Sequence, residues 1–271
     1  MSDIVLSSGV RSNLLQLQQT SDLITQTQTR LATGKRVNSA LDNPINYFTA
    51  QGLSVRANDL NSLLDSMSTG INTIQAANNG ITSITKLVQS AQSLVSQAQQ
   101  TADTNVRATL ASQFDSLLGQ IDQLAGDSGI NGVNLLGGND LTITLNETGL
   151  STVTVTGVND TSAGDLAINA STNSWAGAGD TTAAATDLTA ALVTLRSQSQ
   201  ALSSNLQTVQ IRQDFTKAMI NTLQTGSDSL TLADSNEEGA NLLALQTRQQ
   251  LSTTALSLAA QADQNVLKLF Q

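Results

Sequence analysis

The chain has 271 residues with no Cys, no His and one Pro, and its charged residues make up 12% with a formal net charge of −9. Disulfides, Cys or His zinc sites, a Ser-His-Asp triad and an HExxH metalloprotease motif are therefore excluded. The 12 Lys and Arg are too few for a nucleic-acid surface. We expect no enzyme, no metal and no cofactor, although catalysis by carboxylates alone stays open in principle.

The first predicted helix covers residues 3–33. Its apolar stripe, spaced mostly by seven, consists of Val10, Leu14, Leu17, Ile24 and Leu31. Gly34 is a candidate C-cap, and residues 34–46, with the only proline, are typical of a connecting segment. The N-terminus lacks the pattern of a secretory signal peptide, and no apolar run could span a bilayer. A cytosolic chain and one exported without a cleaved signal both fit.

Residues 47–98 carry the strongest pattern in the sequence. Apolar side chains recur every seven residues at Leu53, Leu60, Met67, Ile74, Ile81, Val88 and Val95. A second row begins with Ala57, Leu64 and Ile71 and then gives way to polar residues, and the stripe is widened on its other side by Leu63, Ala77, Ile84, Ala91 and Ala98. This period predicts a long helix with a coiled-coil seam, which needs partner helices along its length.

Three further segments supply candidate partners. Residues 104–125 have apolar positions three and four apart, and residues 183–224 have leucines and valines mostly seven apart. Residues 236–270 continue the pattern with Leu251, Leu258, Val266 and Leu269. The adjacent Glu237 and Glu238 fit charges at a helix N-terminus better than a catalytic pair, because neighbours on a helix do not face each other.

The centre of the chain differs from both ends. Residues 126–138 are rich in Gly, Asn and Asp and are predicted to form a loop without a phosphate-binding fingerprint. Apolar residues alternate with threonine at 141–145 and 152–156, which predicts a β-hairpin. Residues 159–182 are small and polar, with Trp175 as the one large side chain.

The expected fold is mainly α: a long antiparallel coiled-coil helical bundle from both chain ends, with a small central β-hairpin insert. The terminal helices carry Gln, Ser and Thr on their outer faces and few charges. Such faces can be buried against one another at little electrostatic cost, which favours self-assembly. An ordinary helical bundle with a polar surface is the alternative.

Three motifs point to a family. Residues 30–40 (RLATGKRVNSA), followed by Asp42, resemble the RLSSGxRINSAxDD segment of bacterial flagellins. Residues 130–136 (INGVNLL) resemble the FNGxxLL segment, and residues 264–269 (QNVLKL) resemble the QNVLxLL ending. The Leu-Asp-Asn-Pro at 41–44 is similar to short alphaproteobacterial flagellins of the Caulobacter kind.

This resemblance implies a secreted structural subunit that self-assembles into the extracellular flagellar filament for swimming. A flagellin-like hook–filament junction protein is the alternative. Residues 1–33 and 236–271 would form the inner filament core, with 34–52 and 226–235 as a spoke. Residues 53–140 and 183–225 would form a helical shell, and 141–182 a small β-containing outer region. Implied partners are many copies of the chain, hook-associated and cap proteins, the flagellar export apparatus and a flagellin chaperone, with neither nucleic acid nor membrane insertion.

Candidate site residues follow from the motifs and stripes. Filament-core packing is assigned to the stripes at both chain ends, with burial against neighbouring copies favoured. Spoke or intersubunit contacts are assigned to Arg30, Arg36, Asn38 and Asp42, with solvated charge as the alternative. By family resemblance, O-glycosylation is possible at Thr142, Ser151, Thr154, Thr161, Ser171 and Ser174, which could equally be bare surface hydroxyls.

Overall fold

A computed structural model describes residues 8–269, apart from the side chains of residue 263 and of residues 266–269. The elements in chain order are α1 (Ser8–Thr33), α2 (Pro44–Gln100), α3 (Thr104–Asp127), β1 (Leu141–Thr144), β2 (Thr152–Val155), the 3-10 turn η1 (Asn173–Trp175), α4 (Ala178–Thr231) and α5 (Ser235–Leu269). The predicted mainly α fold with a small central hairpin is confirmed. Contacts divide the chain into two compact units, residues 1–55 with 222–271 and residues 56–221.

Helix starts follow local capping chemistry. α2 begins at Pro44, so the predicted connecting segment 34–46 was wrong for its last three residues. The side chain of Asn43 accepts a hydrogen bond from the Asn46 N–H at 3.0 Å, and proline suits the first helical position because it has no N–H to leave unpaired. At α3, Asp103 caps the N–H groups of Asn105 and Val106 in the same way.

The seven-residue rows of α2 form the buried seam that the sequence predicted. From Leu60 to Val95 every member of the main row is at most 5% exposed. After Ile71 the second row moves one position along the helix, to Ala77, Ile84, Ala91 and Ala98, all buried. This shift occurs where the C-terminal end of α3 packs against α2. The contact there is close: a Cβ added at Gly80 of α2 would lie 2.3 Å from the Oγ of Ser128, the residue that follows α3. The buried face of α2 therefore turns to meet two neighbours.

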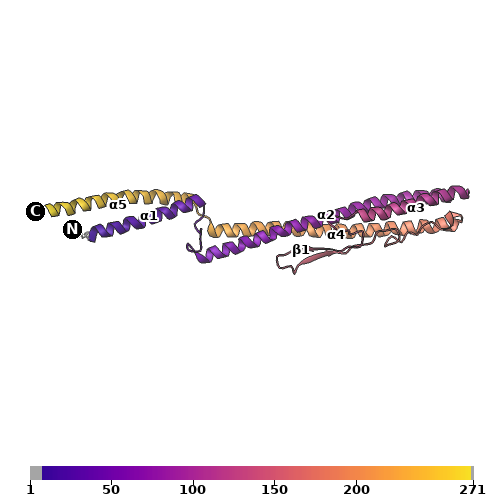
Figure 1. The fold of residues 1–271 in the computed structure, drawn as a ribbon, viewed down its shortest axis with the longest axis horizontal. Coiled ribbons are helices and arrows are strands. Elements are labelled where there is room, and N and C mark those ends of the chain that lie inside the picture. The colour runs from indigo at the N-terminus through magenta and orange to yellow at the C-terminus, as the bar shows by residue number, and fades with distance from the viewer. Residues whose placement is uncertain (1–7, 270–271) are drawn as a thin grey trace. The chain divides into compact units, whose positions relative to one another are not determined.

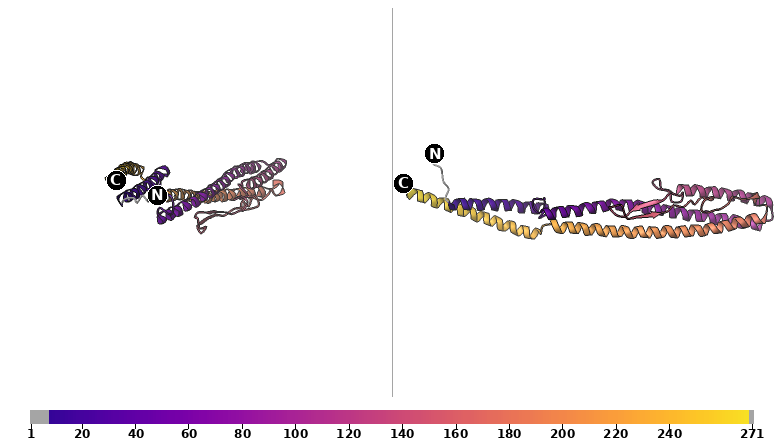
Figure 2. Two further views of the ribbon diagram at one scale, coloured as in Figure 1. Left: turned by 60° about the vertical axis from the view of Figure 1, so that its left-hand side comes forward. Right: turned by 90° about the horizontal axis from the view of Figure 1, so that it is seen from below.

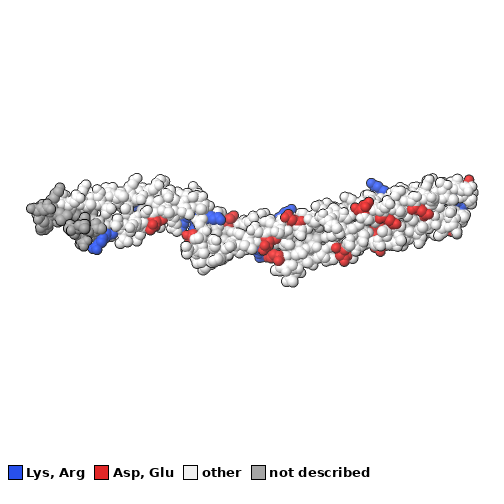
Figure 3. Space-filling model, in the orientation of Figure 1, with Lys and Arg blue, Asp and Glu red and all other residues white. Residues whose placement is uncertain are grey.

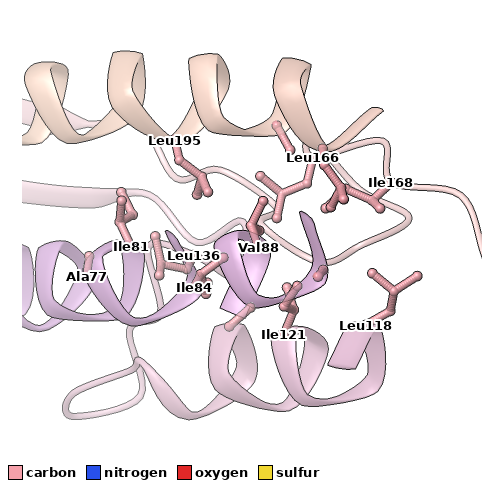
Figure 4. Packing of buried hydrophobic residues seen from close by; sticks show 14 of the residues in the cluster. Ala77, Ile81, Ile84, Val88, Leu118, Ile121, Leu136, Leu166, Ile168 and Leu195 are labelled. Atoms are coloured by element: carbon pink, nitrogen blue, oxygen red, sulfur yellow. The ribbon is translucent and has the colours of Figure 1, made fainter. Parts of the chain in front are cut away.

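The core of the 56–221 unit joins α2, α3, α4 and the central loops. Figure 4 shows Val88 of α2, Ile121 of α3 and Leu195 of α4 around it. Near the middle of α3, the ring of Phe114 packs on that of Trp175 with centroids 5.1 Å apart, and both side chains are fully buried. Hydrogen bonds link the two long helices, from Ser199 Oγ to Asn78 Oδ1 at 2.8 Å and from Gln213 Nε2 to Ser68 Oγ at 3.0 Å.

The central region is fastened to this core. Strands β1 and β2 pair antiparallel with Leu141 opposite Val155, and Ile143 lies where Gly70 leaves α2 without a side chain. The sequence described 159–182 as small and polar, but this loop contributes Leu166 and Ile168 as well as Trp175 to the buried core. Helix α4 also starts at Ala178, inside that range, and continues to Thr231, beyond the predicted end at 224.

Two carboxylates of α3 hold that loop. Asp115 accepts hydrogen bonds from the backbone N–H and the hydroxyl of Ser171, at 2.8 and 2.7 Å. Asp122, two turns further along, accepts the same pair of bonds from Ser162, at 2.6 and 3.1 Å. Each contact satisfies a backbone N–H in a segment that pairs with no strand, so the loop keeps a fixed course.

Candidate functional site

The two terminal helices pair with each other. Figures 1 and 2 show α1 and α5 as antiparallel neighbours, and these are the helices in close backbone contact. The α1 residues facing this contact recur three and four apart: Val10, Asn13, Leu17, Thr20, Ile24, Thr27 and Leu31. The matching α5 positions are Glu238, Leu242, Leu245, Gln249, Ser252, Leu256 and Ala259. We call this contact the terminal seam, and about half of its positions are polar.

A second apolar surface of the terminal helices faces away from the seam. On α5, Leu243, Leu251 and Leu258 are 63–67% exposed. On α1, Leu14, Leu15 and Leu23 are also exposed. Half-polar seams and open leucines together leave much apolar surface uncovered in a single copy. Figure 3 shows that charged side chains are sparse on the visible face of this helix pair.

The residues assigned to filament-core packing therefore occupy two different places. Val10 is buried in the terminal seam, and Leu17, Ile24 and Leu31 are half-buried there. Leu14, Leu251 and Leu258 lie on the open surface. The side chains of Val266 and Leu269 lie outside the described residues. The sequence prediction did not include Thr20 and Thr27, although their spacing midway between the leucines is a coiled-coil signal.

A compact junction joins the ends of α1, α2, α4 and α5. Gly34 ends α1 with a φ of +68°, which confirms the predicted C-cap. Lys35 pairs with Leu232 as an isolated bridge, the Arg36 N–H donates to the Thr231 carbonyl at 2.8 Å, and the Ala233 N–H donates to the Gly34 carbonyl at 3.0 Å. Both chain segments of the junction are thus held by backbone bonds.

The assigned Arg30 and Arg36 lie on one pocket of this junction, with a volume of about 570 Å³. Arg30 Nη1 donates to Glu238 Oε1 at 3.0 Å, and Glu238 is buried. Arg36 Nη2 donates to the Ser229 carbonyl at 3.4 Å. The sequence assigned Glu237 and Glu238 to the first turn of a helix, which the structure confirms, but the pairing of Glu238 with a residue 208 positions away could not be predicted from spacing.

Asp42 and Asn38 stabilise the turn that leads into α2. Asp42 Oδ2 accepts hydrogen bonds from the N–H groups of Asn38 and Ser39, both at 2.9 Å. These bonds hold the pKa of the Asp42 carboxyl below its ordinary value. Asn38 Nδ2 donates to the Lys35 carbonyl at 2.9 Å. The assigned side chains are therefore bonded within the junction of one copy.

The candidate glycosylation positions differ in accessibility. Thr142, Thr154 and Ser174 are exposed, whereas Ser151, Thr161 and Ser171 are half-buried. The Ser171 hydroxyl is bonded to Asp115, and the Thr161 hydroxyl donates to Asn159 Oδ1 at 3.1 Å. Exposure therefore favours the first three positions for any attachment.

One titratable side chain of the core has no partner. Asp160 is fully buried and neither of its carboxylate oxygens is hydrogen-bonded, while the nearby Gln198 Oε1 is also unpaired. Burial raises the pKa of Asp160 to about 6. The Gln198 side chain, near enough to lower this pKa in part but without a hydrogen bond of normal geometry to the carboxylate, opposes the rise, and the charge of Asp165 adds to it. The burial of Asp160 could not be predicted from the sequence, because the residue lies in the small and polar stretch 159–182.

Two properties of the described residues bear on other functions. Within residues 8–269, His, Cys, Asp and Glu nowhere gather in a group of three that could hold a metal ion. Across the same range, no helix combines the length and hydropathy required to cross a membrane.

The chain is similar to known flagellins over its whole length. Residues 8–140 match the family described as the bacterial flagellin N-terminal helical region. Flagellin FljM of Caulobacter vibrioides is 32% identical over 283 residues, covering 100% of this chain and 99% of that protein. A flagellin of Brucella melitensis is 26% identical with complete coverage of both chains. The crystal structure of Bacillus cereus flagellin aligns over 57% of this chain and 88% of that one, at 21% identity and a TM-score of 0.48.

Proposed function

Because this chain belongs to the bacterial flagellin family, as a short member of the Caulobacter type, we propose which of its parts build the flagellar filament. The chain is a structural subunit that is exported and polymerises in many copies into the extracellular filament that drives swimming. The Caulobacter and Brucella relatives match along 99% or more of their own length and are flagellins, which disfavours the hook–filament junction alternative.

The terminal helices form the filament core in this proposal. The observation that carries it is the second apolar surface, with Leu251 and Leu258 more than 60% exposed on a helix pair whose own seam is half polar. Neighbouring copies would cover these leucines and so complete the burial that one pair of terminal helices cannot achieve. The inner core comprises residues 1–33 and 236–271.

The remaining parts follow outward. Residues 34–52 and 226–235 serve as the spoke, supported by the backbone bonds of the junction and the Arg30–Glu238 ion pair. Residues 53–140 and 183–225 form the shell, whose buried core is closed within one copy with the help of Ile143, Leu166 and Trp175 from the outer region. Residues 141–182 form the outer region, where Thr142, Thr154 and Ser174 are the accessible hydroxyls for O-glycosylation.

Partners beyond the polymer are part of the same proposal. As a flagellin, the chain would pass through the flagellar export apparatus with a chaperone and would meet hook-associated and cap proteins at the filament ends. Its role is mechanical, without catalysis. An intact mass of native filament subunits equal to the bare polypeptide would end the glycosylation proposal.

The experiment that tests the core assignment compares two sets of exposed leucines. Purified wild-type chain with filament seeds is expected to form long tubes in negative-stain microscopy. The Leu251→Ser/Leu258→Ser variant should keep a wild-type circular dichroism spectrum and fail to elongate seeds. Leu150→Ser is the control, because Leu150 is 88% exposed in the outer hairpin turn and should not affect growth. Normal elongation by the double variant would contradict the assignment.

A further inference from the structure

An open apolar stripe runs along the start of α2. Its members are Leu41, just before the helix, and Ile45, Phe48, Gly52 and Val55 on it, spaced four, three, four and three apart. Leu41 is 96%, Ile45 77%, Phe48 61% and Val55 52% exposed. This spacing places Ile45, Phe48, Gly52 and Val55 on one face of α2, and Leu41 lies exposed in the turn just before the helix. We call this face the α2 stripe.

The opposite face of the same turns is already packed. Ser227 Oγ donates to the Ala50 carbonyl at 3.1 Å and lies 3.0 Å from Ser54 Oγ. Gly226 of α4 lies against Leu53, since an added Cβ would meet Leu53 Cδ1 at 3.3 Å. The α2 stripe therefore takes no part in the contacts that hold this part of α2 within one copy.

The stripe is free of charge and large. No residue from 43 to 55 is Asp, Glu, Lys or Arg. Four apolar side chains, each more than half exposed, amount to an open patch of several hundred Å², which is the size that marks an interaction surface. A patch of that size on an exported chain would favour association.

Gly52 gives independent evidence for an external contact. It lies inside α2, where glycine lowers helix stability relative to alanine. Its φ is not positive, and a Cβ placed there would meet nothing within 4 Å. In contrast, Gly70 and Gly80 of the same helix are required by Ile143 and Ser128. Nothing inside one copy requires a glycine at 52, and its effect on the surface is a hollow between Phe48 and Val55.

The same chain carries a protruding patch that fits this hollow. Ile211 and Phe215 lie one turn apart on α4 and are 61% and 55% exposed. Arg212 beside them has no ion pair among the described residues, whereas Lys217 contacts the exposed Asp214 at 3.7 Å and donates to Gln213 Oε1 at 3.4 Å. The charges around the patch, Arg212, Asp214 and Lys217, thus sum to +1, and those around the α2 stripe, Asp42, Arg56 and Asp59, sum to −1. The two surfaces are apolar at the centre and carry net charges of opposite sign at the rim.

We propose that the α2 stripe of one copy packs on the Ile211–Phe215 patch of a second copy, with the Phe215 ring in the hollow over Gly52. The proposal rests on the proposed function, because the polymer supplies the second copy. The contact joins two different surfaces, so each copy keeps one free surface for the next copy and the contact can repeat along an open helical polymer.

Crosslinking tests the proposed pair directly, because the chain has no native cysteine. Ile45→Cys subunits are mixed with isotopically labelled Phe215→Cys subunits, grown on seeds, and treated with a short bifunctional thiol reagent. Mixed-mass dimers are the expected product. The control replaces the second subunit by Val193→Cys, at a position on α4 that is 60% exposed. Equal dimer yield with the control, or no mixed dimer in well-formed filaments, would overturn the proposal.

Filling the hollow gives a second, opposite-sign test. Gly52→Leu should leave the thermal midpoint of the monomer unchanged or higher, because leucine favours helix. It should also raise the critical concentration for filament growth at least tenfold. Gly119→Leu is the matched control, since Gly119 is another exposed helical glycine with open space around it. If wild-type filaments form and Gly52→Leu filaments form as readily, the hollow is not a contact; if wild-type chain forms none, the proposed function itself fails.

Discussion

The terminal helix pair and the 56–221 unit solve the same packing problem in opposite ways. In the 56–221 unit, the long helices bury Met67, Ile74 and Leu188 completely. In the terminal seam, the α1 positions alternate between Val, Leu or Ile and Asn or Thr, and the α5 positions include Glu238, Gln249 and Ser252 beside leucines and an alanine. Further leucines of the terminal helices lie on the surface: Leu14, Leu15, Leu23, Leu243, Leu251 and Leu258.

This difference indicates where each region obtains its stability. A buried row of large apolar side chains stabilises a single copy, because the hydrophobic effect scales with area removed from water. The terminal seam, with its polar positions, stabilises the α1–α5 pair only weakly. The second apolar surface of these helices is left for contacts with other molecules. The 56–221 unit is therefore built to fold alone, and the terminal pair to be completed by neighbouring copies.

The largest expected effect comes from one substitution made in both regions. Leu188→Ala should lower the free energy of unfolding by about 2–5 kcal/mol, because it leaves a cavity in a fully buried site. Leu251→Ala should change it by less than about 0.5 kcal/mol, because Leu251 is 67% exposed. Urea unfolding of the monomer followed by circular dichroism gives both values. Equal losses would mean that the terminal helices belong to the fold of the single copy.

A pH-dependent effect should be confined to the 56–221 unit. The pKa of Asp160 is about 6 in the folded chain against an ordinary 3.8, so the fold favours the protonated form. Its stabilising contribution is complete below pH 3.8 and is lost as pH rises to about 6. Asp160→Asn, neutral at every pH, should therefore stabilise the chain by about 1–3 kcal/mol at pH 8 and by almost nothing at pH 4.

The measurement is the difference between wild-type and Asp160→Asn unfolding free energies at pH 4, 5, 6 and 8. Using the difference removes the titration of all other carboxyls, which both chains share. Asp59→Asn is the control, because Asp59 is exposed on α2 and is not among the groups that shift the pKa of Asp160. A constant difference across the pH range would show that Asp160 is not charged and buried at neutral pH.

Substitutions in the terminal seam can raise stability, whereas substitutions in the core of the 56–221 unit lower it. Thr20 and Thr27 are 2% and 6% exposed at seam positions. Thr20→Val/Thr27→Val should stabilise the α1–α5 pair by about 1 kcal/mol per site, as apolar groups replace buried hydroxyls. Hydrogen exchange of α1 amides in the monomer should slow accordingly.

Thr25 and Thr29 provide a matched control for this gain. Both lie on α1 and donate to the carbonyl four residues earlier, as Thr20 does, but both are exposed. Thr25→Val/Thr29→Val should leave the exchange rates of α1 nearly unchanged. If both double variants slow exchange equally, the effect comes from removing those local hydrogen bonds and the seam is not special.

The sequence predicted the region with large buried side chains far better than the other. A strict seven-residue row from Leu60 to Val95 determines which face of α2 is buried, whatever the partner. It could not show that α3 joins at Gly80 and turns that face, because this depends on a contact between distant segments. For the terminal helices, spacing found the leucines but could not say which of Leu17 and Leu251 faces the other helix of the pair.

Among the site residues, contacts between residues close in the sequence could be predicted and contacts between distant residues could not. The motif identified Arg30 and Asp42, and the short-range bonds of Asp42 to Asn38 and Ser39 are local enough to be expected from a turn. The partner of Arg30 and the burial of Asp160 depend on tertiary packing. A single sequence contains no signal for either.

The smallest predicted effect compares one ion pair from each region. Arg30–Glu238 in the terminal pair is 30% and 10% exposed, whereas Arg56–Glu147 in the 56–221 unit is 52% and 23% exposed. Double-mutant cycles with glutamine at each position should give a coupling of about 1 kcal/mol for the first pair and at most about 0.5 kcal/mol for the second. Raising the salt concentration to 1 M should reduce the second coupling more, because exposed charges are screened better. On this prediction the stronger of the two ion pairs lies at the junction, where α1 ends and α5 begins, while the exposed leucines lie further along the two helices. If the Arg30–Glu238 coupling were the weaker one, the junction would not anchor the hairpin in a single copy, and the helix pair would depend on neighbouring copies for its first turn as well as its outer surface.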